Sequence, residues 1–185
     1  MVTLVDLWMP ILVAAVIVFM ASSIIHMVLR YHRSDYKGLP NEDAVRNAVG
    51  PAIAPGQYMF PYCADMKEMK SEAMQKKWET GPVGMLITLK PGKMNMGPML
   101  LKWFLYCILI SALAGYLAEV SLDRTATYMV VFRLVATAAL LGYAGGAISQ
   151  GIWQGRPWST VVKDVIDGAI YAMLTAGTFG WLWPR

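Results

Sequence analysis

The chain of 185 residues is 57% hydrophobic and only 15% charged. This composition excludes an intrinsically disordered chain and is more apolar than that of most soluble domains. The 16 Lys and Arg and the 12 Asp and Glu leave a formal charge of +4. Because these charges are grouped between apolar runs and no DNA-binding motif is present, the excess indicates membrane topology rather than nucleic-acid binding.

Four apolar runs are long enough to cross about 30 Å of hydrocarbon. They are Leu7–Leu29, Leu101–Val120, Tyr128–Ser149 and Asp164–Trp183. The first run has no preceding Lys or Arg and is too long for a signal-peptide core, so we expect it to remain as an anchor. The sequence therefore predicts an all-α membrane protein built as a bundle of four transmembrane helices.

A long polar segment separates the first two runs and divides the chain into three parts, 1–30, 31–98 and 99–185. Within it, cap, turn and alternation signals predict a small α+β module. Its expected elements are a helix to Val49 capped by Asn41, a strand Gln57–Tyr62, a helical stretch Asp65–Glu79 and a strand Gly84–Leu89.

The positive charges predict the orientation of the chain. Eleven of the 16 Lys and Arg lie in 30–102, and Arg156 and Lys163 join the same side. Only Arg124, Arg133 and Arg185 fall toward the other face. By the positive-inside rule, we expect both termini outside and the 31–98 module in the cytoplasm, as in a bacterial inner membrane.

A polar cluster is predicted where the first and fourth runs meet the inner interface. His26 lies about one turn from the end of its run, and Asp164 and Asp167 lie at a similar depth. A carboxylate holding one imidazole nitrogen would leave the other for a proton, a quinone oxygen or a metal ion. The simpler interpretation is a hydrogen bond within the bundle and two acids near a helix start. Since His32 lies outside the run, a bis-His haem is not indicated.

Two further sets of polar or sulfur-containing side chains are candidates. Glu119 and Arg133 are the natural ion pair at the outer end of the second and third runs, as a structural clamp or as a gate. In the module, thioethers and a thiol form a potential copper(I) set, Met59, Cys63, Met66 and Met69. The alternative is an apolar stripe of an amphipathic helix that faces lipid headgroups between lysines.

Small residues at four-residue spacing predict close helix packing in the last two runs. They are Ala138, Gly142 and Gly146 in the third run, and Ala172 and Ala176 in the fourth. Much of this spacing would serve the bundle itself, but it also leaves surface for a partner within the bilayer.

The chain lacks the GxGxxG, Walker A, HExxH and GxSxG motifs, so we assign no catalytic residue and no cofactor. We expect a non-catalytic accessory or assembly subunit that contacts membrane lipids and other integral membrane subunits or a second copy. One alternative is a redox- or metal-linked protein, for copper or quinone, that uses His26 with the two aspartates or the Met-rich loop. Another is a lipid-modifying enzyme with His26 as its base.

Overall fold

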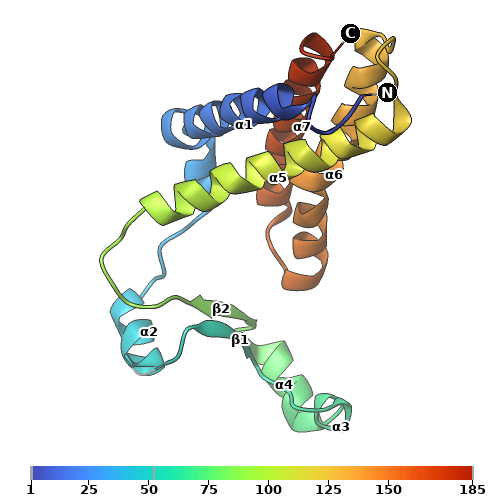
Figure 1. Ribbon diagram of the computed structural model, residues 1–185. Coiled ribbons are helices and arrows are strands. Elements are labelled where there is room, and N and C mark those ends of the chain that lie inside the picture. Colours follow the sequence, from blue (N-terminus) through green and yellow to red (C-terminus); the bar gives the residue numbers. More distant parts are fainter. Residues whose placement is uncertain (1, 52, 185) are drawn as a thin grey trace. The chain divides into compact units, whose positions relative to one another are not determined.

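The computed structural model describes residues 2–51 and 53–184, and Arg185 of the expected outer charges lies outside them. The chain divides into two compact units, Met1–Tyr36 with Asn95–Arg185 and Lys37–Met94. The first unit contains α1 (Trp8–Ser23), a π-helical turn η1 (Ile24–Val28), a 3-10 turn η2 (Tyr31–Ser34), α5 (Gly97–Ser121), α6 (Tyr128–Gln154) and α7 (Trp158–Trp181) (Figure 1).

The long helices of the first unit correspond to the four predicted runs, although α1 ends at Ser23 and is continued by η1 to Val28, and α7 ends at Trp181. Each packs against two others: α1 against α5 and α7, and α6 against α5 and α7. Figure 1 shows α5 crossing α6 and α7 obliquely, whereas α6 and α7 run side by side. The loops that join α5 to α6 and α6 to α7 are short, as expected for neighbouring helices.

Within the described residues, three helices are long and apolar enough to cross a membrane: Trp8–Val28, Gly97–Ser121 and Tyr128–Gln154. These helices are consistent with an integral membrane protein. The helix of the fourth run forms, but α7 does not meet the same criterion of length and composition. Its first ten residues include Lys163, Asp164 and Asp167, and a charge within a span is costly to place in hydrocarbon.

The helices approach one another closely at small residues. A Cβ on Gly142 would lie 2.7 Å from Ile110 Cδ1, and one on Gly168 would lie 2.8 Å from Ala144 Cβ. Of the expected packing positions in the last run, Ala172 and Ala176 are buried.

Two packing positions predicted in the third run are less enclosed. Ala138 is only partly buried against the core, and a Cβ on Gly146 would meet no described atom within 4 Å. Gly145 is equally open. The small-residue pattern of α6 therefore faces both a neighbouring helix and open surface.

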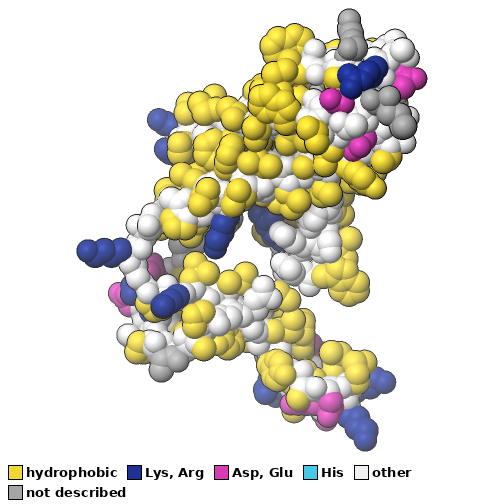
Figure 2. Space-filling model, viewed as in Figure 1, with side chains coloured by type: hydrophobic (Ala, Val, Ile, Leu, Met, Phe, Trp, Pro, Cys, Tyr) yellow, Lys and Arg dark blue, Asp and Glu magenta, His cyan; other side chains and the backbone are white. Residues whose placement is uncertain are grey.

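Large apolar side chains also cover the outside of the first unit. Val16 of α1, Leu113 of α5 and Leu141 of α6 are all more than 45% exposed. Figure 2 shows hydrophobic side chains over much of the visible face of these helices. Contiguous apolar surface on this scale is typical of proteins that contact lipid or other proteins.

The second unit has the order helix, strand, two short helices, strand. It contains α2 (Glu42–Val49), β1 (Gly56–Phe60), α3 (Met66–Met69), α4 (Glu72–Thr80) and β2 (Gly84–Thr88). The two strands pair antiparallel, with Gly56 opposite Thr88 and Phe60 opposite Gly84. The hydroxyl of Thr88 accepts from the Gly56 amide and donates to the carbonyl of Ala54, which secures the open end of this ribbon.

Two local expectations in this unit are wrong. The predicted helix 65–79 is divided, because Ser71 adopts an extended conformation and its hydroxyl caps α4 by accepting from the Met74 amide. Asp65 caps α3 in the same way. Asn41 does occupy the position before α2, but with φ of +63° and no capping hydrogen bond from its side chain.

Candidate functional site

The polar cluster of the first unit is assembled from three elements. His26 lies in the π-helical turn η1, His32 in the 3-10 turn η2, and Asp167 ten residues into α7. The π-turn is defined by the Leu29 amide, which donates to the carbonyl of Ile24 five residues earlier. Such turns are rare and occur often at functional sites, because they shift side chains off the regular helical faces.

The η1 and η2 turns bring the two histidines together on one side of Asp167. Their ring centroids lie 4.4 Å apart, with 31° between the ring planes. His32 is mostly enclosed, whereas 49% of the His26 side chain is exposed. His32 therefore forms the enclosed side of the cluster, and His26 forms the side that is accessible from outside.

Asp167 is the central acceptor, and its side chain is only 4% exposed. Its Oδ2 lies 2.7 Å from Nε2 of His32 and 3.7 Å from Nε2 of His26. Its Oδ1 accepts a hydrogen bond from the hydroxyl of Tyr31. Nε2 of His26 also lies 3.4 Å from the hydroxyl of Tyr171 on the next turn of α7.

A second carboxylate holds the other side of His32. Nδ1 of His32 lies 2.6 Å from Oδ2 of Asp35, and Nζ of Lys163 donates to Oδ1 of Asp35 over 2.6 Å. The same Lys163 ammonium donates to the carbonyl of Tyr31 and to the hydroxyl of Ser34. All three protons of the ammonium are therefore used to fasten residues 31–35 to α7.

These contacts shift the ionisation of the groups outside the spans. Burial alone would lower the pKa of His32, but its hydrogen bonds to Asp35 and Asp167 outweigh burial and raise it. Burial alone would raise the pKa of Asp35, but Lys163 and His32 lower it overall. Burial and the bond to Asp167 raise the pKa of Tyr31. Both nitrogens of His32 therefore face carboxylate oxygens, which favours the protonated ring and raises its pKa above the ordinary value.

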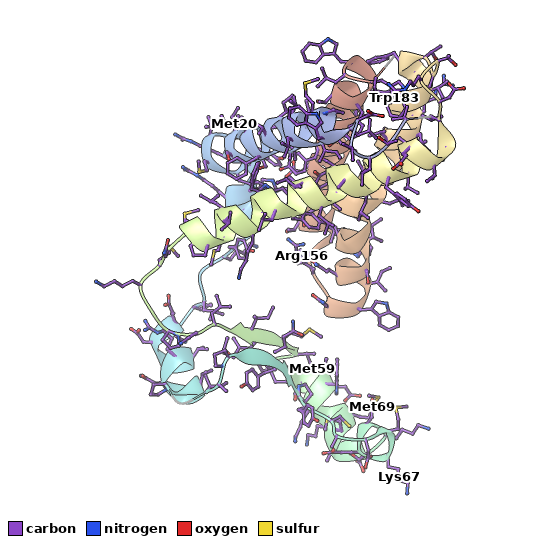
Figure 3. All side chains as sticks on the ribbon, viewed as in Figure 1. Met20, Met59, Lys67, Met69, Arg156 and Trp183 are labelled. Atoms are coloured by element: carbon purple, nitrogen blue, oxygen red, sulfur yellow. The ribbon has the colours of Figure 1, made fainter. Side chains whose placement is uncertain are left out.

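The structure brings together two of the three residues predicted at the inner interface. His26 and Asp167 are neighbours, whereas Asp164 forms an ion pair with Arg156, with Nη1 and Oδ2 2.5 Å apart. Figure 3 labels Arg156, which precedes α7.

The predicted outer pair, Glu119 of α5 and Arg133 of α6, is not joined by a salt bridge in the described part of the chain. Arg133 lies exposed on its helix. At that end, Arg124 instead pairs with Asp6 over 2.7 Å.

Of the sulfur set, Met59 belongs to β1 and Met69 to α3, and both are about two-fifths exposed (Figure 3). The Cys63 thiol donates to the carbonyl of Asp65, and Met66 is 64% exposed.

Four members of the cluster lie outside the predicted site: Tyr31, His32, Asp35 and Lys163. A signal for the pair His32 and Asp35 is present in the sequence, since residues three apart can meet across one turn. That the turn folds back onto α7, however, depends on contacts about 130 positions away in the chain.

Metal-binding chemistry fits the cluster. His26, His32 and Asp167 each offer one ligand atom, and these three atoms lie within 4.8 Å of one another. Two imidazoles and one carboxylate suit Zn²⁺, Fe²⁺ or another divalent transition metal, and such a set leaves coordination positions open.

Comparisons with protein-family models, with curated proteins and with solved structures found no match. The fold and the cluster define a class only: in the part of the chain that the structure describes, three helices are long and apolar enough to cross a membrane, and a His–Asp cluster lies at the end of the first. The geometry of that cluster carries the functional conclusion.

Proposed function

We propose that this chain is an integral membrane protein that binds one divalent transition-metal ion through His26, His32 and Asp167. The observation that carries the proposal is the convergence of three ligand atoms from three elements within 4.8 Å. This is the metal-linked alternative inferred from the sequence, with His32 in the place expected for Asp164.

The present spacing is close to that of a coordination sphere. Ligand atoms about 2.0–2.2 Å from a tetrahedral metal lie roughly 3.3 Å from one another. The two distances from Asp167 Oδ2, 2.7 Å to His32 and 3.7 Å to His26, bracket that value. Small side-chain shifts would therefore bring these two pairs to the spacing around a bound ion, and all three ligand atoms already lie within 4.8 Å of one another.

The groups around the three ligands support the same proposal. A histidine that binds metal usually donates its second N–H to a carboxylate, which fixes the tautomer and the ring. Nδ1 of His32 meets Asp35 in that way, and Asp35 is itself held by Lys163. The Tyr31 hydroxyl orients the second oxygen of Asp167. A metal ion would replace the proton that Nε2 of His32 otherwise shares with Asp167.

The proposal includes four membrane-spanning helices, with α7 as the fourth. Both termini would lie outside and 31–98 in the cytoplasm, which puts the metal site at the inner surface of a bacterial inner membrane. The exposed side of His26 would then face the interface between lipid headgroups and hydrocarbon.

Cobalt binding tests the proposal. Protein purified in mild detergent and stripped with a chelator should bind one equivalent of Co²⁺, with ligand-field absorption bands. His32→Ala and Asp167→Asn should each weaken Co²⁺ binding at least tenfold, whereas Asp164→Asn is the matched control on the same helix and should not. If the wild-type protein binds no Co²⁺, or if the two Asn variants behave alike, there is no metal site here.

A second candidate function is the accessory or assembly subunit. The specific observation in its favour is the open surface of α6 at Gly145 and Gly146, where an added Cβ would meet no described atom within 4 Å. Exposed glycines allow a partner helix to approach the backbone closely. Gly146→Leu should release a co-purifying partner in a native gel, while Leu141→Phe, at a large exposed residue of the same helix, should retain it. A wild-type protein that migrates as a single chain would exclude this function.

A further inference from the structure

A groove runs alongside the proposed metal site, between the end of the first helix and the beginning of α5. It has a volume of about 310 Å³ and is lined mainly by apolar side chains, with His26 in its wall. Its other walls include Met27 from η1 and Met99, Leu100 and Trp103 from α5. Both helices that form it are among the three long and apolar enough to cross a membrane.

The polar groups of the groove are two serine hydroxyls, the indole N–H and His26, and the Ser23 hydroxyl already donates to the carbonyl of Phe19. The Ser22 hydroxyl already accepts from Nε1 of Trp103 over 2.7 Å and donates to the carbonyl of Phe19. His26 differs, because its Nε2 faces Asp167 and Tyr171 while its Nδ1 makes no hydrogen bond to any described residue. Nδ1 of His26 is thus available to a bound molecule.

The proton on that nitrogen determines what it can bind. If Nε2 coordinates a metal or accepts from Tyr171, the neutral ring carries its proton on Nδ1. Nδ1 is then a hydrogen-bond donor directed at an acceptor oxygen. None of the described residues that line the groove is Lys, Arg, Asp or Glu, so a charged headgroup finds no counter-ion. The groove therefore favours a neutral carbonyl oxygen over a phosphate.

The apolar walls define the remainder of the ligand. Thioethers adapt to flat rings and make favourable contacts with them, and an indole offers a flat face. Met27, Met99 and Trp103 would surround a planar ring in this way. Apolar side chains such as Met20, which is 56% exposed, continue along α1 toward the hydrocarbon and offer a path for a long tail.

We infer that this groove binds the headgroup of a membrane-soluble quinone, with a ring carbonyl accepting from Nδ1 of His26. The inference shares His26 with the metal site, but it does not require the metal, because the groove and the unbonded Nδ1 are present without one. It concerns binding only. An acyl chain of a phospholipid is the other occupant that such a groove can accept, and the experiment separates the two.

The test uses the full chain, stripped of metal by a chelator, in lipid nanodiscs. A photoreactive azidoquinone with a decyl tail should label peptides that contain Ser22–Met27 and Met96–Trp103. Excess decylubiquinone should reduce that labelling at least fivefold, whereas the same excess of phosphatidylglycerol should not. Labelling spread over other lipid-facing peptides, or equal competition by the phospholipid, would show that the groove holds only an acyl chain.

Two tryptophan variants make the test specific to the groove. Met99→Trp should fill the groove and reduce labelling at least fivefold, since Met99 is 63% exposed and supports no core. Leu105→Trp is the matched control, on the same helix and 54% exposed but outside the groove. Folding of both is checked by elution as a single peak.

The two variants also separate the quinone site from the metal site. If the Met99→Trp variant still binds Co²⁺ but is no longer labelled by the azidoquinone, the quinone site is separate from the metal site. If labelling of the Met99→Trp variant is undiminished, the quinone inference is overturned and the metal proposal is unaffected. If the wild-type protein binds no Co²⁺, only the metal proposal is overturned.

Discussion

Asp167 and Asp164 lie three residues apart on α7, and we predict that neutralising them has very different costs. The Asp167 side chain is 4% exposed and accepts a charge-assisted bond from His32, a class worth about 1.5–3 kcal/mol. Asp167→Asn retains an acceptor for Tyr31 but places an amide opposite His32. We therefore expect a loss of about 2–3 kcal/mol in the free energy of unfolding.

The Asp164 pair is more exposed, since Arg156 and Asp164 retain 31% and 26% of their side-chain surface. Exposed ion pairs contribute about 0.2–1 kcal/mol, so Asp164→Asn should cost less than about 1 kcal/mol. The assay is reversible unfolding by SDS in mixed micelles, followed by circular dichroism at pH 6 with chelator present. Equal losses for the two variants, within about 0.5 kcal/mol, would refute the argument from burial.

Three further predictions test the ionisation and the packing. In metal-free protein, the raised pKa of His32 contributes stability that is complete below its ordinary value of 6.5 and is lost as pH rises through the raised value. The free energy of unfolding should therefore fall as pH rises above 6.5 in wild type but not in His32→Gln. Gly168→Ala places a Cβ 2.8 Å from a side-chain carbon of α6 and should cost about 1–3 kcal/mol in SDS unfolding, whereas Gly146→Ala meets no described atom and should be neutral or stabilising. Phe179→Ala empties a fully buried position and should lower the free energy of unfolding by about 3–5 kcal/mol. Trp181→Ala, at a side chain that is 74% exposed, should lower it by less than about 0.5 kcal/mol. Similar losses for the two variants would contradict the assignment of the core.

Hydropathy predicted the long helices well, because their ranges depend on local composition. An uncharged run of about 20 residues is helical wherever backbone groups cannot bond to water, so the helices follow from the residues themselves. The strands of the second unit were found for a similar reason, since turns of Pro and Gly bound both. Ser71 shows where prediction from local sequence fails. A serine can cap a helix or lie within one, and only the backbone conformation of Ser71 shows that it caps α4.

Only part of the site was predictable from sequence, because burial in the folded chain, and not spacing along the helix, determines which aspartate joins the cluster. Asp164 and Asp167 are about 60° apart around the helix, so periodicity alone could not choose between them. Their roles depend on partners outside the helix. The loop that precedes α7 supplies Arg156 as the partner of Asp164, whereas the turn that contains His32 covers Asp167. Neither partner is determined by the local sequence of α7.

Two of the charges that make α7 the least apolar of the long helices, Lys163 and Asp167, form their hydrogen bonds within the cluster. The Lys163 ammonium donates hydrogen bonds to residues 31–35, and the Asp167 carboxylate accepts hydrogen bonds from Tyr31 and His32. A charge that is paired and hydrogen-bonded in this way costs far less to bury than a free one. If α7 crosses the membrane as proposed, its first turns therefore depend on the segment that follows the first helix, and a metal ion bound there would strengthen the same attachment. On that proposal, the side chains that form the polar cluster are also the ones that would allow α7 to enter the membrane.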